Sequence, residues 1–276
     1  GESLWHGNVK SAGKNYIDIS TDIEEYTKPQ TVNEYNNEFK LFACVLDGRG
    51  FGQYLEVKEY NNGRLYFAED WTVIPDETTV VTVCKATHHN IWLNNNTDLS
   101  NGSSQFIYNA GLENIVCGHE TNLAPGMNMY ATYNPGTNEG LCCCAYNKII
   151  RCQTKASGDG ISIISGTVYM PAKEDFYKRT HGTFGNIIRN NTLDGAPGLM
   201  YVKNQSKWIE SRGDAALVLN GAYNITEKNR FANYHNAICI INKCEGNYFA
   251  NNCYYSTLKR FKSDESEIGP DKEPKW

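Results

Sequence analysis

The chain has 276 residues, of which 40% are hydrophobic, a net charge of -5 and a pI of about 5.7. This acidic balance argues against nucleic acid and against anionic membrane surfaces as partners, because both need clustered Lys and Arg. No run of 18 apolar residues exists that could span a bilayer. Residues 1–5 do not resemble a signal peptide, so we expect either that a leader has been removed or that the chain is a fragment.

Strand signals dominate along the chain. β-branched or apolar runs bounded by turn residues predict strands at residues 79–84, 160–170 and 215–219. Turn signals, in which Gly or Asn supplies a positive φ, stand at Asp47-Gly48, Asn62-Gly63, Asp194-Gly195 and Asn220-Gly221.

Helical periodicity is scarce. Residues 18–40 and 228–243 are the segments that could hold short helices. The charged, Pro-containing residues 262–276 predict a solvated strap or a frayed end. We find no internal repeat, and the pattern is typical of a mostly β protein with a few helices.

Ten widely spread cysteines favour disulfides in an oxidising compartment over zinc, whose paired Cys spacing is missing. They are Cys44, Cys84, Cys117, Cys142, Cys143, Cys144, Cys152, Cys239, Cys244 and Cys253. Five N-x-[ST] sequons also favour the secretory pathway, although an Asn-rich chain carries some by chance. The predicted glycosylation sites are Asn95, Asn101, Asn190, Asn204 and Asn224.

Few residues suggest chemistry by themselves. Ser3 could be a hydrolase nucleophile and His235 its base, since residues from opposite chain ends can meet in space. For Ser3 and His235 alike, the alternative is an ordinary solvated or structural role. Trp92 and nearby tyrosines among polar residues could line a shallow sugar pocket, but a lone Trp also serves as core packing.

Several short blocks, taken in order, resemble the hemagglutinin-esterase glycoproteins of corona-, toro- and influenza C-like viruses, and more distantly influenza hemagglutinin. The blocks are Gly1-Glu2-Ser3, residues 15–19, 48–52, 65–75, 84–93, 138–140, 158–171, 205–208, 212–215 and 232–235. The resemblance implies a jelly-roll lectin-like β-sandwich inserted into a split SGNH-esterase-like α/β domain. The implied segments are 1–75 and 201–276 for the esterase-like parts and 76–200 for the receptor-binding domain.

The same resemblance implies site residues. Ser3 would be the nucleophile, Gly50 and Asp70 would stand at the oxyanion positions, and His235 would be the base. Asp70 replaces the family's oxyanion Asn, and Ala232 replaces the carboxylate that orients the histidine. Because a carboxylate repels the developing oxyanion, these departures predict a vestigial esterase.

The sequence therefore predicts the head of a viral surface attachment glycoprotein that binds a host-cell receptor, most simply a sialylated glycan, as part of a homo-oligomeric spike on the virion. An active sialate-O-acetylesterase and a protein-receptor-binding ectodomain remain the alternatives. No cofactor or metal is expected. The predicted ligand-binding residues are Val81, Thr82, Val83, Trp92, Tyr133, Asn134 and Glu139.

Overall fold

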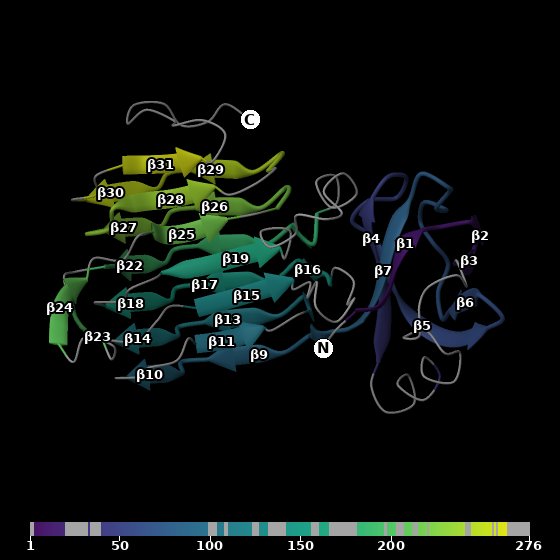
Figure 1. Cartoon of the computed structure of the whole chain (residues 1–276), viewed down its shortest axis with the longest axis horizontal. Coiled ribbons are helices and arrows are strands. Elements are labelled where there is room, and N and C mark those ends of the chain that lie inside the picture. Colours follow the sequence, from purple (N-terminus) through teal and green to yellow (C-terminus); the bar gives the residue numbers. More distant parts are fainter. Residues whose placement is uncertain are drawn as a thin grey trace.

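The computed structural model describes residues 3–19, 33, 40–98, 104–107, 110–122, 127–131, 142–155, 160–165, 181–195, 198–202, 207–211, 215–219, 221–240, 244–255, 257 and 259–263. Every element whose bounds it describes is a β-strand. Figure 1 shows these strands in two units, an antiparallel sheet near the N-terminus and a long stack of parallel coils. In the described part of the chain, no helix has the length and apolar character needed to cross a membrane.

The N-terminal sheet has seven antiparallel strands in the order β1-β7-β4-β5-β6-β3-β2. Their bounds are β1 Ser3–Asn8, β2 Ser11–Gly13, β3 Tyr16–Asp18, β4 Leu41–Asp47, β5 Tyr54–Asn61, β6 Arg64–Phe67 and β7 Val80–Lys85. Asn62 and Gly63, with φ of 47° and 83°, turn β5 into β6, as a tight hairpin with two positive φ values requires. The hairpin turn predicted at this pair is confirmed.

Both faces of β4 are buried, and alternate residues enter different cores. Leu41, Ala43 and Val45 pack in the core of the N-terminal sheet, together with Trp5. Phe42, Cys44 and Leu46 pack instead against the parallel coils. The continuous apolar run of β4 therefore joins the two units.

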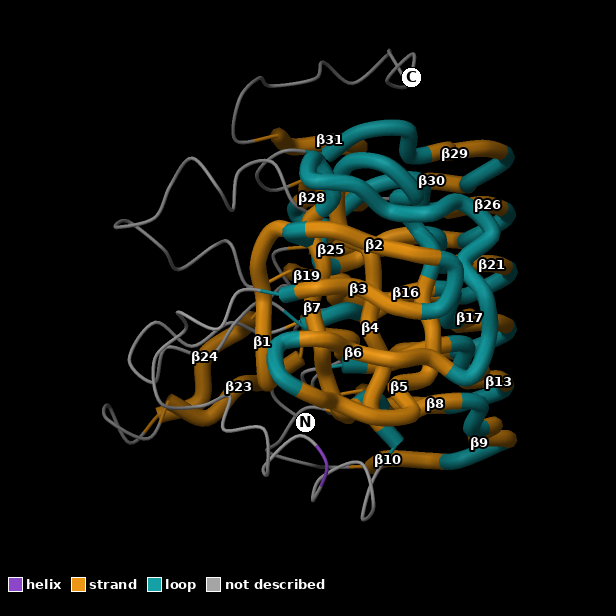
Figure 2. The backbone as a smooth tube through the Cα atoms, turned by 90° about the vertical axis from the view of Figure 1, so that its right-hand side faces the viewer, coloured by secondary structure: helices purple, strands orange, loops and turns teal. Residues whose placement is uncertain are grey.

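The second unit is a parallel β-helix (Figures 1 and 2), whose described strands form six coils. Its short strands stack into four sheets, and each strand pairs in parallel with its counterpart in the next coil. Sheet I holds β8 Thr87–His88, β12 Gly111–Leu112, β16 Cys144–Ala145 and β20 Thr183–Phe184, and is continued by bridges at Ala222 and Glu245. Sheet II holds β9 Ile91–Leu93, β13 Ile115–Cys117, β17 Lys148–Ile150, β21 Ile187–Arg189, β26 Ile225–Glu227 and β29 Tyr248–Ala250.

The other two sheets complete the coils. Sheet III holds β10 Asn96–Asp98, β14 Glu120–Asn122, β18 Gln153–Lys155, β22 Thr192–Asp194, β27 Arg230–Ala232 and β30 Cys253–Tyr255. Sheet IV holds β11 Ser104–Ile107, β15 Met127–Ala131, β19 Ile161–Ser165, β25 Ala215–Leu219, β28 Asn236–Ile240 and β31 Lys259–Ser263. In coil 4 an antiparallel hairpin, β23 Gly198–Val202 and β24 Lys207–Ser211, is inserted between sheets III and IV.

Two corners repeat in every coil, one between sheets I and II and one between sheets II and III. At each corner, a residue with positive φ comes directly before a residue that occupies the same place in every coil. We call the series of these equivalent residues a ladder. The first set of positive-φ residues is His89, Glu113, Tyr146, Gly185, Tyr223 and Gly246, and the second is Asn94, Gly118, Arg151, Asn190, Lys228 and Asn251. Asn and Gly recur among them because these residues enter the left-handed region at least cost.

Asparagine fills the ladder positions that follow. The first ladder is Asn90, Asn114, Asn147, Asn186, Asn224 and Asn247. The second is Asn95, His119, Cys152, Asn191, Asn229 and Asn252, so two of its members are not Asn. Asn186 shows the bonding pattern: its Nδ2 donates to the Cys144 carbonyl at 3.1 Å and to Asn224 Oδ1 at 3.0 Å. Its Oδ1 accepts from the backbone N–H and the Nδ2 of Asn147, both at 3.0 Å. All amide hydrogen-bonding groups of this buried side chain are satisfied.

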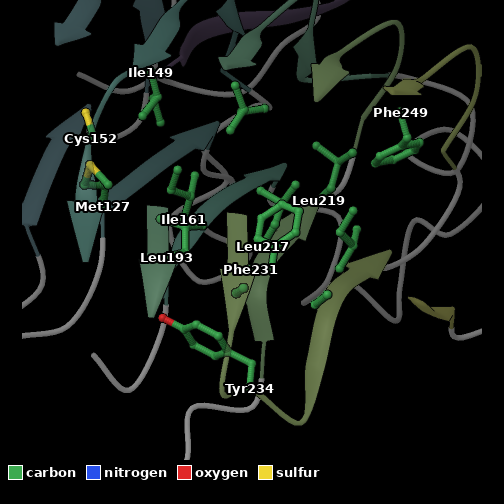
Figure 3. Packing of buried hydrophobic residues seen from close by; sticks show 14 of the residues in the cluster. Met127, Ile149, Cys152, Ile161, Leu193, Leu217, Leu219, Phe231, Tyr234 and Phe249 are labelled. Carbon is green, nitrogen blue, oxygen red and sulfur yellow. The ribbon is translucent and has the colours of Figure 1, made fainter. Parts of the chain in front are cut away.

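The interior of the β-helix is mainly apolar. The middle residues of the sheet II and sheet III strands point inward, and besides the apolar ones they include the buried Thr121, Thr154 and Thr226. Figure 3 shows Ile149, Leu193, Leu217 and Phe231 meeting in this core, with Tyr234 beside them. The β-helix is therefore a packed solid and not a tube.

Several predictions are corrected. The fold class is wrong, since the chain carries a parallel β-helix and neither a jelly-roll lectin domain nor a split SGNH-like α/β domain. The absence of an internal repeat is wrong, and so is the helix at 228–243, which holds β27 and β28. The helix expected at 18–40 lies mostly outside the described residues. The strands predicted at 79–84 and 215–219 are confirmed as β7 and β25.

The disulfide expectation is not met either. All ten cysteines lie within the described residues, and no disulfide joins any of them. Five of them are buried near the junction of the two units, at Cys44, Cys84, Cys142, Cys143 and Cys144. In this structure the buried cysteines serve as small apolar residues that fill the cores, whereas Cys253 is exposed.

Candidate functional site

The outer face of sheet III is more polar than the outer face of sheet II. The first and third residues of most of its strands are more exposed than the middle residue, because side chains alternate along a strand. In β27 the third residue, Ala232, is buried. The outward polar and aromatic residues, which we call the sheet III face, are Asn96, Asp98, Glu120, Asn122, Gln153, Lys155, Thr192, Asp194, Arg230 and Tyr255. The parallel register places two of them on each of coils 1 to 4 and one on each of coils 5 and 6.

Hydrogen bonds orient two carboxylates on this face. Asn122 Nδ2 donates to Asp98 Oδ1 at 3.0 Å, across the first two coils. Asn233 Nδ2 donates to Asp194 Oδ1 at 2.7 Å, from a residue with a φ of 61° just beyond β27. Since each carboxylate keeps a second oxygen, both remain able to accept further hydrogen bonds.

An aromatic platform stands at the coil 6 end of the sheet III face. The Tyr255 side chain is 48% exposed, and the Arg230 guanidinium lies 4.6 Å from the centre of its ring. Between Tyr255 and Asp194 the corresponding position holds the small Ala232. Tyr255 therefore presents a half-exposed ring with a cation over one of its faces, and little side-chain bulk stands between the ring and the next carboxylate.

The neighbouring wall, the outer face of sheet II, has the opposite character. Ile91, Leu93 and Tyr248 are more than half exposed at 61%, 59% and 55%. In the strands between them, the first outward residue is Ile in three of four cases, at Ile115, Ile187 and Ile225. On the same face, Arg189 forms an ion pair with Glu227. The two walls thus differ in the ligands they suit: sheet III offers hydrogen bonds and sheet II offers apolar contact.

A polar network lies at the junction of the two units. Tyr54 of the N-terminal sheet donates to Glu113 Oε1 at 2.7 Å, and His89 Nε2 lies 3.2 Å from Glu113 Oε2. His89 Nδ1 in turn lies 2.9 Å from His88 Nδ1. Burial and then the hydrogen bond to Glu113 raise the pKa of Tyr54, so this phenol stays protonated. Burial lowers the pKa of His88, with the charge of His89 as a second cause.

We interpret this network as a structural contact between the two units and not as a reaction centre. His89 and Glu113 occupy corner positions whose positive φ recurs in every coil, so their backbone conformation is a property of the fold. Tyr54 also packs against Tyr146, and Phe42 against His88, with ring centres 6.3 and 4.9 Å apart. Among the described residues, no group of three or more His, Cys, Asp or Glu could hold a metal ion.

The structure does not bring together the residues proposed for an esterase. Ser3 is buried in the N-terminal sheet, where its Oγ lies 2.9 Å from Thr82 Oγ1 and donates to the Trp5 carbonyl at 2.8 Å. His235 is exposed between β27 and β28. The turn between β27 and β28 lies on the side of the β-helix that faces away from the N-terminal sheet (Figure 1).

The two oxyanion candidates lie in a turn and at an exposed position. Gly50, with a φ of 83°, lies in the turn between β4 and β5, and its carbonyl accepts from Gln53. Asp70 is exposed just before the buried Trp71. The Ser3 hydroxyl makes its contacts with Trp5, Thr82 and Val83, so the described residues do not assemble an oxyanion site around it.

The predicted ligand-binding residues are also dispersed. Val81, Thr82 and Val83 are buried in β7, where they cannot form the rim of a pocket. Trp92 is the inward residue of β9 and packs on the core of the β-helix, which is the alternative that the sequence left open. Tyr133, Asn134 and Glu139 lie outside the described residues.

Three sequons fall in the described part of the chain. Asn95 and Asn190 are exposed. Asn224 is fully buried and its Nδ2 donates to Asn247 Oδ1 at 3.0 Å, so a glycan attached there would break the ladder. The repeat itself generates these sequons, since an Asn at or beside a corner is followed by a strand rich in Thr. Asn101 and Asn204 lie outside the described residues.

Sequence reasoning missed the sheet III face because it missed the repeat. Asp194, Arg230 and Tyr255 each lie one or three residues after a ladder Asn. The signal that could have found them is the recurring pair of Asn residues five positions apart, seen at 90/95, 186/191, 224/229 and 247/252.

No family model matches the chain, and no curated protein matches it. Among solved structures, the tailspike protein gp49 from Pseudomonas phage LKA1 is similar, with 12% identity over 92% of this chain and a TM-score of 0.24. The Gp54 tailspike of Acinetobacter baumannii bacteriophage AP22, solved in complex with A. baumannii capsular saccharide, shows 9% identity over 91% and a TM-score of 0.23. The chain spans 42% and 46% of those two chains. With TM-scores this low, neither likeness carries an argument about function.

Proposed function

We propose that this chain is the glycan-binding part of a surface attachment protein, and that a linear saccharide lies along the sheet III face, parallel to the axis of the coils. The observation that carries the proposal is the column of oriented polar groups on this face, which ends at the exposed ring of Tyr255 beside Arg230.

The chemistry of this face suits sugar hydroxyls. Carboxylates and amides such as Asp98 and Asn122 accept and donate the hydrogen bonds that hydroxyls make, and an exposed tyrosine ring stacks on the C–H face of a sugar. The hydrogen-bonded strands of successive coils lie about 4.8 Å apart. One ring of an extended glycan has a comparable length, so each sugar can meet the side chains of a new coil.

The scaffold lowers the entropic cost of binding. The side chains of the sheet III face stand on strands whose backbones are fixed by the coils on either side, and Asp98 and Asp194 are oriented by amides. Preorganised groups lose little freedom when the ligand arrives. A shallow face still holds one sugar weakly, at roughly millimolar Kd, so useful adhesion requires several sugars or several copies.

A matched pair of tyrosines tests the proposal. A glycan array of neutral, acidic and sialylated saccharides, probed with a multivalent form of the protein, identifies a ligand. Tyr255→Ala is then expected to weaken that binding by about tenfold, equivalent to ~1.4 kcal/mol. Tyr248→Ala, which removes an equally exposed ring from sheet II, is expected to leave binding unchanged. Equal losses in the two variants, or an array without any bound glycan, would contradict the proposal.

The esterase reading gains no support from the placement of Ser3 and His235, which lie in different units. Location on a virion or cell surface, a sialylated ligand and assembly into a homo-oligomer stay part of the proposal. The array separates sialylated from other acidic and neutral saccharides, and sedimentation of the purified protein gives its oligomeric state.

The sheet II face favours a second candidate function, contact with a protein. Its exposed Ile91 and Leu93 offer apolar surface of the kind that protein interfaces bury. The double variant Ile91→Lys and Leu93→Lys is expected to abolish such a contact while leaving glycan binding intact. Adhesion that soluble glycans do not inhibit but this double variant removes would favour the protein partner.

A further inference from the structure

An arginine lies over a tyrosine ring at two places in the described part of the chain. In the N-terminal sheet, Arg64 Cζ lies over the Tyr16 ring, 4.0 Å from its centre. The same guanidinium binds a carboxylate: its Nε donates to Asp18 Oδ1 at 2.6 Å and its Nη2 donates to Asp18 Oδ2 at 2.9 Å. The ring covers one face of the guanidinium, and the N–H groups in the guanidinium plane are left for the carboxylate.

The second pair, Arg230 and Tyr255, lies on the sheet III face. Arg230 Cζ lies over the Tyr255 ring, 4.6 Å from its centre, and both side chains are exposed. Among the described residues, the arginines that form ion pairs are Arg49, Arg64 and Arg189, and Arg230 is not one of them. The second pair therefore repeats the ring and the guanidinium of the first pair without the bound carboxylate.

We infer that the Arg230–Tyr255 pair is the subsite of the sheet III face that binds the carboxylate of an acidic saccharide. The inference rests on the proposed function, since it assigns a negative charge to one sugar of the ligand that lies along this face. The guanidinium donates two N–H groups to the sugar carboxylate, in the way that Arg64 donates to Asp18. Uronic acids and sialic acids both present a carboxylate of this kind.

The neighbours of Arg230 suit an anionic ligand. In the parallel register Arg230 stands between Thr192 of coil 4 and Cys253 of coil 6, and neither neighbour is a carboxylate. Asp194 stands two residues beyond Thr192 on β22, and its Oδ1 accepts from Asn233 Nδ2 at 2.7 Å. The two charges are therefore separated along the strands: Asp194 accepts hydrogen bonds from sugar hydroxyls, and Arg230 binds the carboxylate.

Paired ligands test the charge of the bound sugar. Oligogalacturonate and sialyllactose supply the carboxylate from the two sources, and carboxyl reduction converts each into a neutral alcohol of similar shape. Titrations followed by NMR measure the weak binding. For whichever source binds the wild-type protein, carboxyl reduction is expected to weaken binding by about tenfold, the loss expected for charge-assisted hydrogen bonds at an exposed site.

A matched pair of arginine variants assigns the effect to Arg230. Arg230→Lys keeps the charge but loses the planar pair of donors, so it is expected to weaken binding of the acidic form by about tenfold. The same variant is expected to bind the carboxyl-reduced form as the wild type does. Arg151→Lys, at an exposed corner of coil 3, is expected to bind both forms unchanged. Melting temperatures check that both variants are folded.

The outcomes separate this inference from the proposed function. Equal binding of the acidic and reduced forms, or equal losses of the two forms in Arg230→Lys, would overturn the carboxylate subsite. So would binding of neither acidic probe by a protein that binds neutral glycans on the array. In these three cases a glycan that still depends on Tyr255 leaves the proposed function standing, whereas an array without any bound glycan removes the proposed function and this inference together.

Discussion

Asn186 and Asn224 stand at the same corner of successive coils, and the Oδ1 of Asn224 accepts both the backbone N–H and the side-chain N–H of Asn186 at 3.0 Å. The relationship repeats from coil to coil: Asn147 donates in the same way to Asn186, and Asn224 to Asn247. These buried amides hold the coils in register, and the first prediction concerns them.

Replacing Asn186 by Asp is expected to destabilise the protein by about 3–5 kcal/mol, because it places an unpaired carboxylate in the core and leaves the Cys144 carbonyl without its donor. Denaturant unfolding followed by circular dichroism measures the loss. Asn190→Asp, at an exposed corner position nearby, is the control and should change stability by no more than about 0.5 kcal/mol. Similar stability of the two variants would argue against the role assigned to the ladder.

Cys152 occupies a ladder position in coil 3, and its replacement by Asn is expected to stabilise the chain by about 1 kcal/mol. Its Sγ lies 3.7 Å from the Val116 carbonyl, the counterpart of the Ile149 carbonyl to which Asn191 Nδ2 donates. An amide at position 152 can donate there and to Asn191. Burial raises the pKa of Cys152 to about 11, so the thiol is a weak, neutral donor at neutral pH.

Thermal melting of Cys152→Asn and Cys152→Ala checks this prediction. The Ala variant removes the thiol without supplying an amide and should melt below the wild type, whereas the Asn variant should melt above it. Melting of both variants below the wild type would show that the site cannot accommodate the ladder.

Lys228 is a corner residue with a φ of 56°, where coils 1, 4 and 6 carry Asn94, Asn190 and Asn251. Lys228→Asn is expected to stabilise the protein by a few tenths of a kcal/mol to about 1 kcal/mol, because Asn tolerates the left-handed region better. Lys228→Val is expected to cost about 1–2 kcal/mol, since a β-branched side chain is strained there. Melting temperatures that do not rank Asn above Lys above Val would contradict this assignment.

Stability should fall as the pH drops below the ordinary histidine pKa of 6.5. Burial, followed by the charge of His89, lowers the pKa of His88 in the folded chain. The unfolded chain therefore binds more protons in this range, and acid shifts the equilibrium toward it. Protonation of His88 also removes the ability of its Nδ1 to accept a hydrogen bond from His89 Nδ1.

Melting temperatures between pH 8 and pH 5 measure this effect. His88→Gln should reduce the acid sensitivity but not abolish it, because burial also lowers the pKa of His119. An unchanged pH profile in His88→Gln would mean that the junction does not respond to acid.

The sequence indicated the strands of the N-terminal sheet better than it indicated the β-helix. Residues 79–84 and the Asn62-Gly63 turn carry their structure locally, in β-branched runs and in residues that accept positive φ. The β-helix depends on ladder residues separated by 24, 33, 39, 38 and 23 positions along the first ladder. Because the segments between sheets III and I vary in length, no fixed period exists to be found.

The candidate site was missed for the same reason. Alternation within three-residue strands is too short to show which residues point outward, so Arg230 and Tyr255 looked like any other polar or aromatic residues. Once Asn229 and Asn252 are aligned as ladder positions, the outward residues follow by counting one and three positions onward. Ser3 and His235 were linked by a resemblance whose fold this chain does not share.

The corner ladders have one more consequence. Each ladder amide bonds only to the coils directly above and below it, so no coil depends on a distant one for its polar contacts. Stability then behaves as a sum over neighbours along a line. A protein built this way can gain or lose whole coils and change its reach while its cross-section stays the same.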